Sequence, residues 1–262
     1  MKKCVILGLV FGLFALILVG CQGSTSRATV DEVFMNSLST GLEARWVLST
    51  NTDNQKFVNG STEHREYYSK LVDAELNELS QYKDKEFENA ELQALALEYI
   101  GLLDTQKDSL QYIVMDFNKY NDMWFPAFNK RSQLIKQFVN NYDLKVSDKY
   151  TATLNDMINN SDKVTADEQE TAAVQAMLRS MQFVVIDDSS SWKNYQATVE
   201  NTSGSDFTNF SLTINLMDGG GAILGTTYAS VANWSNGQKA NLEFSTDKQF
   251  VTTDLVANYA VK

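Results

Sequence analysis

The sequence contains little cysteine, proline or histidine. Among its 262 residues are two cysteines, one proline and one histidine. Both cysteines, Cys4 and Cys21, lie near the start, so the later part of the chain has no disulfide bond to stabilise it. A catalytic dyad or a zinc site needs more imidazole or thiolate groups than His64 alone supplies. We therefore predict that the chain is not an enzyme, that it binds no metal and no cofactor, and that His64 lies at the surface.

Long apolar runs are also scarce, with one exception at the N-terminus. The segment from Val5 to Val19 is almost entirely apolar, follows Lys2 and Lys3, and precedes a polar stretch. It is too short to cross a bilayer comfortably, because a spanning helix needs about 20 residues. This layout is typical of a secretory signal peptide.

The end of that apolar run carries a specific motif. Leu18, Gly20 and Cys21 resemble the lipobox of bacterial lipoproteins. The resemblance implies that residues 1–20 are a signal peptide and that Cys21 carries diacylglycerol, with 21–28 as a tether. Two acyl chains meet the requirement for stable anchoring. We expect a lipid-anchored protein on the extracellular face of the cell membrane, in a Gram-positive cell; an ordinary signal peptide and an uncleaved anchor are the alternatives.

Basic residues are few. Without residues 1–20 the chain has 20 lysines and arginines against 33 acidic residues, a formal charge of −13. Nucleic-acid binding depends on Lys and Arg neutralising phosphates, so we expect no nucleic-acid partner. The remaining 242 residues are enough for two domains with hydrophobic cores.

Residues 29–184 have the pattern of an antiparallel helical bundle. Thr29 and Glu32 have the spacing of a capping box, and apolar residues then recur every three or four positions. The strongest such pattern predicts one long helix from about Glu86 to Tyr120, with Gln106 inside its packing seam. Five or six helices joined by short loops therefore form the predicted bundle.

Pro126 interrupts this pattern, because proline inside a helix removes a hydrogen bond and clashes with the preceding turn. We predict a kink, or a new helix capped by Asn121 or Asp122. Two further helices are expected, one over about 149–159 and one opened by a capping box at Thr165 and ending near residue 184.

From residue 185 the composition changes to that of a β-protein. Residues 185–191 are predicted as a linker, and 192–262 contain short alternating strands separated by turn signals. Gly219–Gly221 is predicted as a hairpin turn to which Asp218 forms hydrogen bonds. The fold class is therefore α+β multidomain, an all-α bundle followed by a small all-β sandwich.

The same region resembles the FxLYD domain of bacterial surface and secreted proteins. Leu216 and Asp218 match that family's Leu and Asp, whereas Ile214 replaces its Phe and Met217 its Tyr. The resemblance extends over the following residues: Val199, Asn201, Ser203, Phe210, Leu212, Gly219, Gly225, Asn236, Gly237 and Phe244. It covers about 192–260 and implies an immunoglobulin-like sandwich of the kind found in adhesion or assembly modules, with no catalytic residues.

Aromatic residues cluster around the single proline. Tyr120, Trp124, Phe125 and Phe128 belong either to the bundle core, which their helical spacing favours, or to a groove for a partner. We take them as the candidate partner-binding residues. The acidic residues instead concentrate at helix starts, where the helix dipole stabilises them.

These features predict a non-enzymatic cell-surface lipoprotein that acts as a binding module for a protein or peptide in the cell envelope. An alternative is an envelope glycan hydrolase that uses two bundle carboxylates with the aromatic patch as its subsite. A third possibility is a solute receptor for an importer, which the lack of alternating strands and helices disfavours.

Overall fold

The computed structural model describes residues 28–50 and 56–262, and this part of the chain has an α+β fold. Helices precede antiparallel strands in the sequence, which confirms the coarse fold class. The helices are α1 (Val30–Ser49), α2 (Thr62–Leu79), α3 (Ala90–Ser109), α4 (Phe117–Tyr142) and α5 (Thr151–Ser180). The strands are β1 (Val184–Asp187), β2 (Lys193–Glu200), β3 (Phe207–Met217), β4 (Ile223–Val231), β5 (Lys239–Thr246) and β6 (Thr252–Val261).

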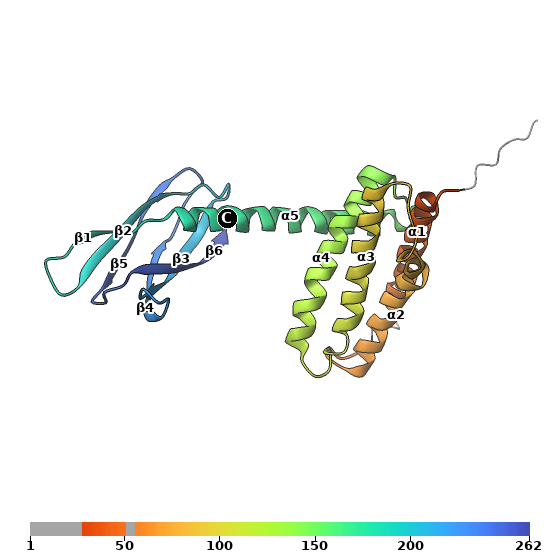
Figure 1. Cartoon of the computed structure of the whole chain (residues 1–262), viewed down its shortest axis with the longest axis horizontal. Coiled ribbons are helices and arrows are strands. Elements are labelled where there is room, and N and C mark those ends of the chain that lie inside the picture. Colours follow the sequence, from red (N-terminus) through yellow and green to blue (C-terminus); the bar gives the residue numbers. More distant parts are fainter. Residues whose placement is uncertain (1–27, 51–55) are drawn as a thin grey trace, which may run out of the picture.

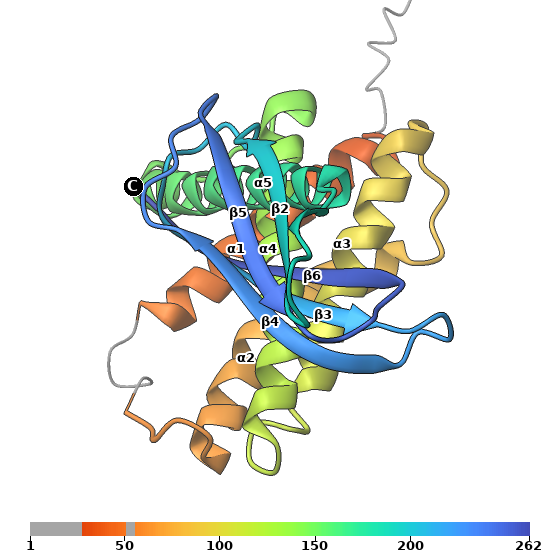
Figure 2. The same cartoon turned by 90° about the vertical axis from the view of Figure 1, so that its left-hand side faces the viewer.

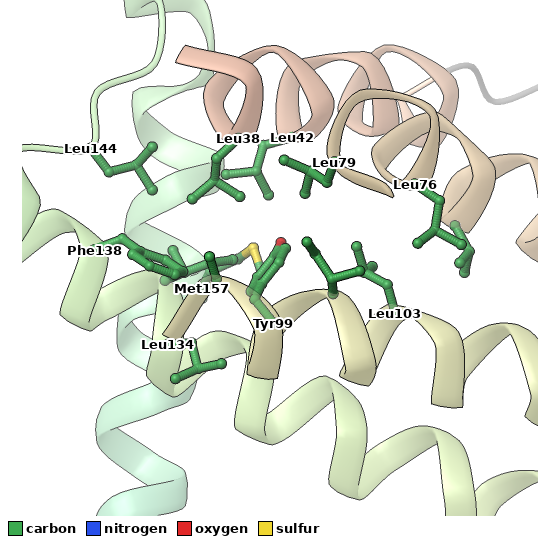
Figure 3. Packing of buried hydrophobic residues seen from close by; sticks show 14 of the residues in the cluster. Leu38, Leu42, Leu76, Leu79, Tyr99, Leu103, Leu134, Phe138, Leu144 and Met157 are labelled. Atoms are coloured by element: carbon green, nitrogen blue, oxygen red, sulfur yellow. The ribbon is translucent and has the colours of Figure 1, made fainter. Parts of the chain in front are cut away.

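The helical bundle has one core, formed by the helices α1 to α4 and the first turns of α5. The predicted capping box of α1 is present, since Thr29 accepts a hydrogen bond from Glu32 and Glu32 from Thr29. Leucines of α1 to α4 meet the ring of Tyr99 at the centre of this core (Figure 3). Met157 of α5 belongs to the same cluster, so α5 packs against the other four helices through this core.

The long helix predicted from Glu86 to Tyr120 is in fact two helices. α3 ends at Ser109, a turn follows, and Asp116 caps α4 by accepting a hydrogen bond from the Lys119 amide. The apolar spacing continues across the turn because Leu110 and Ile113 are themselves buried in the core. Spacing alone therefore did not reveal the break.

The new helix predicted after Pro126 is wrong, because α4 runs without interruption through this proline. Pro126 and Asp122 are both exposed. The carbonyl of Asp122, which would normally bind the missing amide, belongs to an exposed residue and can hydrogen-bond to solvent. Neither Asn121 nor Asp122 caps a helix.

The two helices predicted over 149–159 and 165–184 form the single helix α5. The expected cap at Thr165 lies in its interior. Thr165 and Glu168 instead accept hydrogen bonds from Gln133 of α4, at 3.4 and 2.9 Å. These polar residues therefore join α5 to α4. Figure 1 shows α5 running from the bundle to the strands.

The strands form two three-stranded sheets, β1-β2-β5 and β4-β3-β6, all antiparallel. Their core includes the end of α5, since Val174, Met177 and Leu178 are buried against the sheets. Viewed from the strand end, the strands lie in front of the bundle helices (Figure 2). The antiparallel sandwich is thus present, and α5 contributes to both cores.

Part of the linker predicted over 185–191 is strand. β1 covers Val184–Asp187 and pairs with β2, because the alternating β2 offers an edge that a short adjacent segment can extend. The turn after β3 is as predicted: Asp218 accepts hydrogen bonds from the amides of Gly220 and Ala222, at 2.8 and 2.9 Å.

Candidate functional site

The four aromatic residues singled out in the sequence do not form one surface. Tyr120 and Trp124 are buried in the bundle core, and Phe125 is exposed. Phe128 packs partly buried against the core and lines a pocket on its other side. Two of these residues therefore pack in the core, Phe128 lines a pocket, and Phe125 lies at the surface.

His64 is buried, so the prediction that it lies at the surface is wrong. Its Nδ1 accepts a hydrogen bond from the Gly60 amide at 3.0 Å, and its ring stacks on Phe57 with centroids 4.5 Å apart. Burial lowers the pKa of His64 below its ordinary value. The burial of His64 follows from aromatic packing around the first turn of α2, since its ring also contacts Tyr68, Phe117 and Tyr120.

The bundle core contains a charged cluster that the sequence analysis did not identify. Glu75 of α2 is fully buried and binds two arginines: Nη1 of Arg45 at 2.8 Å, and Nη2 of Arg131 at 2.6 and 2.8 Å from its two oxygens. The Tyr99 hydroxyl donates to Glu75 at 2.5 Å, and Arg131 also donates to Gln106 at 3.0 Å. Four helices thus meet in one polar network inside an apolar core.

A signal for this cluster was present in the sequence. Glu75 stands four residues after Leu71 and four before Leu79, so it lies within the apolar stripe of α2. Arg131 precedes Phe138 by one heptad in α4 and occupies the same kind of position. Charged residues in a buried stripe are rare unless they are paired, so they indicate partners on neighbouring helices.

The cluster carries one more positive than negative charge. Burial would raise the pKa of Glu75, but Arg131 and Arg45 outweigh it and hold that pKa below its ordinary value. Burial, together with the nearby Arg131, lowers the pKa of Arg45. Burial alone would lower the pKa of Arg131, but Glu75 and Tyr99 outweigh this effect and raise that pKa overall. The lowered pKa keeps Glu75 ionised near neutral pH, and arginine side chains stay protonated in proteins, so one positive charge has no carboxylate of its own in the cluster.

A pocket of about 290 Å³ opens beside this cluster, between α1, α4 and α5. Arg45 and Arg131 form part of its wall, and Trp46, Phe128 and Met157 supply its apolar sides. Its other lining residues are Ser49, Thr153, Asp156 and Asn160. A mainly apolar wall with a few convergent polar groups is typical of a small-molecule site.

Two buried nitrogen donors of the cluster have no hydrogen-bond partner in the described part of the chain. They are Nε of Arg131 and Nε2 of Gln106. Arg131 is 1% exposed, and its other two nitrogens are bound to Glu75, Tyr99 and Gln106. A buried donor without a partner costs about 1–3 kcal/mol, so the cluster favours an additional acceptor.

Within residues 28–50 and 56–262, no group of three or more His, Cys, Asp or Glu side chains is placed to hold a metal ion. None of the helices in this part of the chain is both long and apolar enough to cross a membrane. Glu75 is the one acidic side chain buried there, and two arginines bind it. The pair of opposed free carboxylates that a glycan hydrolase needs is therefore not formed around it.

No protein-family model and no curated protein matches the chain. A solved structure of the alkylpurine DNA glycosylase AlkC of Pseudomonas fluorescens, bound to DNA containing an abasic site analogue, matches with 9% identity and a TM-score of 0.17. The match covers 87% of this chain and 76% of that chain.

The predicted function, a non-enzymatic surface lipoprotein that binds proteins or peptides, is corrected here: no comparison supports it. Neither it nor its hydrolase and importer alternatives is carried further. With a TM-score of 0.17, the match does not transfer glycosylase activity to this chain either. The lipobox at Cys21 lies outside the described residues and stays a prediction, as does the FxLYD resemblance.

Proposed function

We propose that the helical domain binds a small molecule in the pocket between α1, α4 and α5. The observation that carries this proposal is the pocket itself, with apolar walls around two arginines that share a single buried carboxylate. Its volume of about 290 Å³ lies at the lower end of the usual range for ligand pockets, about 300–1,000 Å³. The ligand is therefore small, of the size of a single ring or a short branched chain.

The position of α5 suggests what binding would do. Thr153 and Met157 near its start line the pocket, and Met177 near its end is buried among the strands. A ligand that holds the start of α5 against α4 would also restrict the helix that carries the sandwich. The proposed role is thus a ligand-responsive unit, in which binding in the bundle limits the motion of the β-domain.

Two tryptophan variants on neighbouring residues of α5 test this proposal. Thr153→Trp places a large ring in the pocket, whereas Ala152→Trp adds the same ring at an exposed position that does not line it. A library of small anionic, neutral and cationic compounds is screened for a rise in unfolding temperature. We expect a compound that stabilises the wild type and the Ala152→Trp variant but not the Thr153→Trp variant. If no compound shows this pattern, the pocket is not a binding site.

We also propose that the chain is held at the extracellular face of the membrane through a lipid on Cys21. The support is the sequence of residues 1–21 alone. A chain that carries a formal charge of −13 after residue 20 gains nothing from anionic headgroups, so attachment should depend on the lipid. Cys21→Ala is then expected to release the protein into the medium. Continued membrane retention of this variant would instead indicate an uncleaved apolar anchor.

A further inference from the structure

The charge balance around the pocket identifies the class of ligand. Arg45 and Arg131 bind the same carboxylate, Glu75, and this leaves one positive charge over in a low-dielectric site. Desolvating a charge costs several kcal/mol unless a partner compensates it. A ligand with one negative charge restores the balance, whereas a dianion would reverse it.

The other acidic residue at the pocket does not supply this charge. Asp156 lines the pocket from α5, but its side chain is exposed to solvent. In the described part of the chain, the ion pairs of Arg45 and Arg131 are with Glu75. The surrounding water screens Asp156, so it compensates the buried guanidinium groups only weakly.

A free donor of the pocket wall specifies the ligand's polar group. Nε of Arg131, which lines the pocket and is 1% exposed, has no partner in the described part of the chain. This atom donates, so it matches a group that only accepts. Arginine's planar array of donors suits a planar carboxylate in particular.

The walls specify the rest of the ligand. Trp46, Phe128 and Met157 come from three different helices and line the pocket with apolar surface. Such a lining favours a compact apolar body over a sugar or a polyphosphate, which would leave hydroxyl or phosphate oxygens against apolar side chains. About 290 Å³ leaves room for one ring or a branched aliphatic group.

We propose that the pocket binds a small monocarboxylate with a compact apolar body, its carboxylate at Arg131 and Arg45 and its apolar body between Trp46, Phe128 and Met157. This inference rests on the proposed function and names its ligand class. No covalent step is involved, and Glu75 remains bound to both arginines.

Calorimetric titration with matched probes tests the inference. Benzoate and benzamide have nearly the same shape, but only benzoate carries a charge. We expect benzoate to bind the purified protein about tenfold to a hundredfold more tightly than benzamide, because hydrogen bonds to charged groups are the stronger kind. Inorganic phosphate, which lacks the apolar body, should bind more weakly than benzoate. Benzoate binding should persist in Ala152→Trp and be lost in Thr153→Trp.

A second variant addresses the charge directly. Arg45→Gln removes the surplus positive charge, and benzoate should then bind about tenfold more weakly. Because Arg45 also holds Glu75, circular dichroism must first show that this variant is folded; if it is not, the tryptophan pair decides the question.

The outcomes separate the inference from the proposed function. Equal binding of benzoate and benzamide, both lost in Thr153→Trp, would overturn the monocarboxylate and leave the pocket as a binding site. Benzoate binding that survives Thr153→Trp would place the anion elsewhere and overturn the inference. A screen in which only neutral or cationic compounds bind the pocket would overturn the ligand class alone, and one in which nothing binds would overturn both proposals.

Discussion

Glu75 neutralises one of the two positive charges in the bundle core. It is fully buried, accepts hydrogen bonds from Arg45, Arg131 and Tyr99, and has no contact with solvent. A buried ion pair contributes little compared with a well-packed apolar core, but removing one of its members leaves an uncompensated charge behind. The cluster is therefore sensitive to the loss of its single acid.

Glu75→Gln should destabilise the protein strongly. The substitution leaves two buried arginines without a counter-charge, which costs about 3–5 kcal/mol of unfolding free energy. Denaturant unfolding measures the loss. Asp104→Asn is the matched control, since Asp104 forms an exposed ion pair with Lys83 at 2.6 Å and should contribute less than about 1 kcal/mol. Equal losses in the two variants would show that the buried cluster has no special energetic role.

His64 should make stability depend on pH near neutrality. Burial lowers its pKa in the folded state below the ordinary value of 6.5. Below pH 6.5 the imidazole therefore binds a proton in the unfolded chain more readily than in the folded chain. The contribution of His64 to the free energy of unfolding is fully present above this pH and is lost as the pH falls below it. Glu75, whose ordinary value is 4.5 and whose folded pKa is lower, weakens the fold only in a separate, more acidic range.

The chain has one histidine, which makes this prediction simple to measure. An NMR titration of the native protein should give a pKa below 6.5 for the single imidazole. Unfolding free energy should decrease between pH 7.5 and 5.5, and His64→Gln should remove most of that decrease. A native pKa at or above 6.5 would contradict the burial of this ring.

At the scale of elements, α4 contains the one residue least suited to a helix interior. Pro126 lies in an unbroken helix and is exposed. Interior proline costs about 3 kcal/mol or more. Replacing this one residue should therefore make α4 more stable.

Pro126→Ala should therefore stabilise the protein, by about 1–3 kcal/mol after allowing for the greater freedom that alanine gives the unfolded chain. Denaturant unfolding at constant pH measures the gain. Phe125→Ala, at an exposed neighbouring position, should change stability much less. A loss of stability in Pro126→Ala would mean that the proline ring itself is needed for the packing of α4.

The helical bundle and the strand region could be predicted from apolar periodicity, but the breaks between elements could not. Leu110 and Ile113 stay buried after α3 has ended, so the pattern continued where the helix did not. Conversely, Thr165 has the sequence of a cap in the middle of α5. Local preference was overridden in both cases by contacts with other elements.

The candidate site was missed for a related reason. Glu75, Arg45 and Arg131 lie far apart in the sequence, on three helices, and each one alone resembles a solvated charge. Their position within apolar stripes was visible, but pairing them requires knowing which helices are neighbours. Of the four aromatic residues predicted near Pro126 as a binding surface, Phe128 is the one that lines the pocket.

At the scale of the whole molecule, α5 makes the two domains interdependent. Its first half packs on the bundle, and its last turns bury Val174, Met177 and Leu178 among the strands. Ser205 of the strand region also donates to Glu170 of this helix at 2.7 Å. The folding unit that contains the sheets therefore begins inside a helix and not at the change of composition near residue 185.

A fragment of residues 168–262 should thus fold cooperatively, whereas 192–262 should not. The shorter fragment lacks β1 and three apolar side chains of the core, each of which contributes about 1.5–3 kcal/mol when fully buried. Thermal unfolding followed by circular dichroism compares the two. In the full chain, Met177→Ala should cost about 2–5 kcal/mol, while Gln175→Ala, on the exposed side of the same turn, should be nearly neutral. If 192–262 unfolds as cooperatively as the longer fragment, the end of α5 only rests on the sandwich, and the proposed transmission from pocket to strands loses its structural basis.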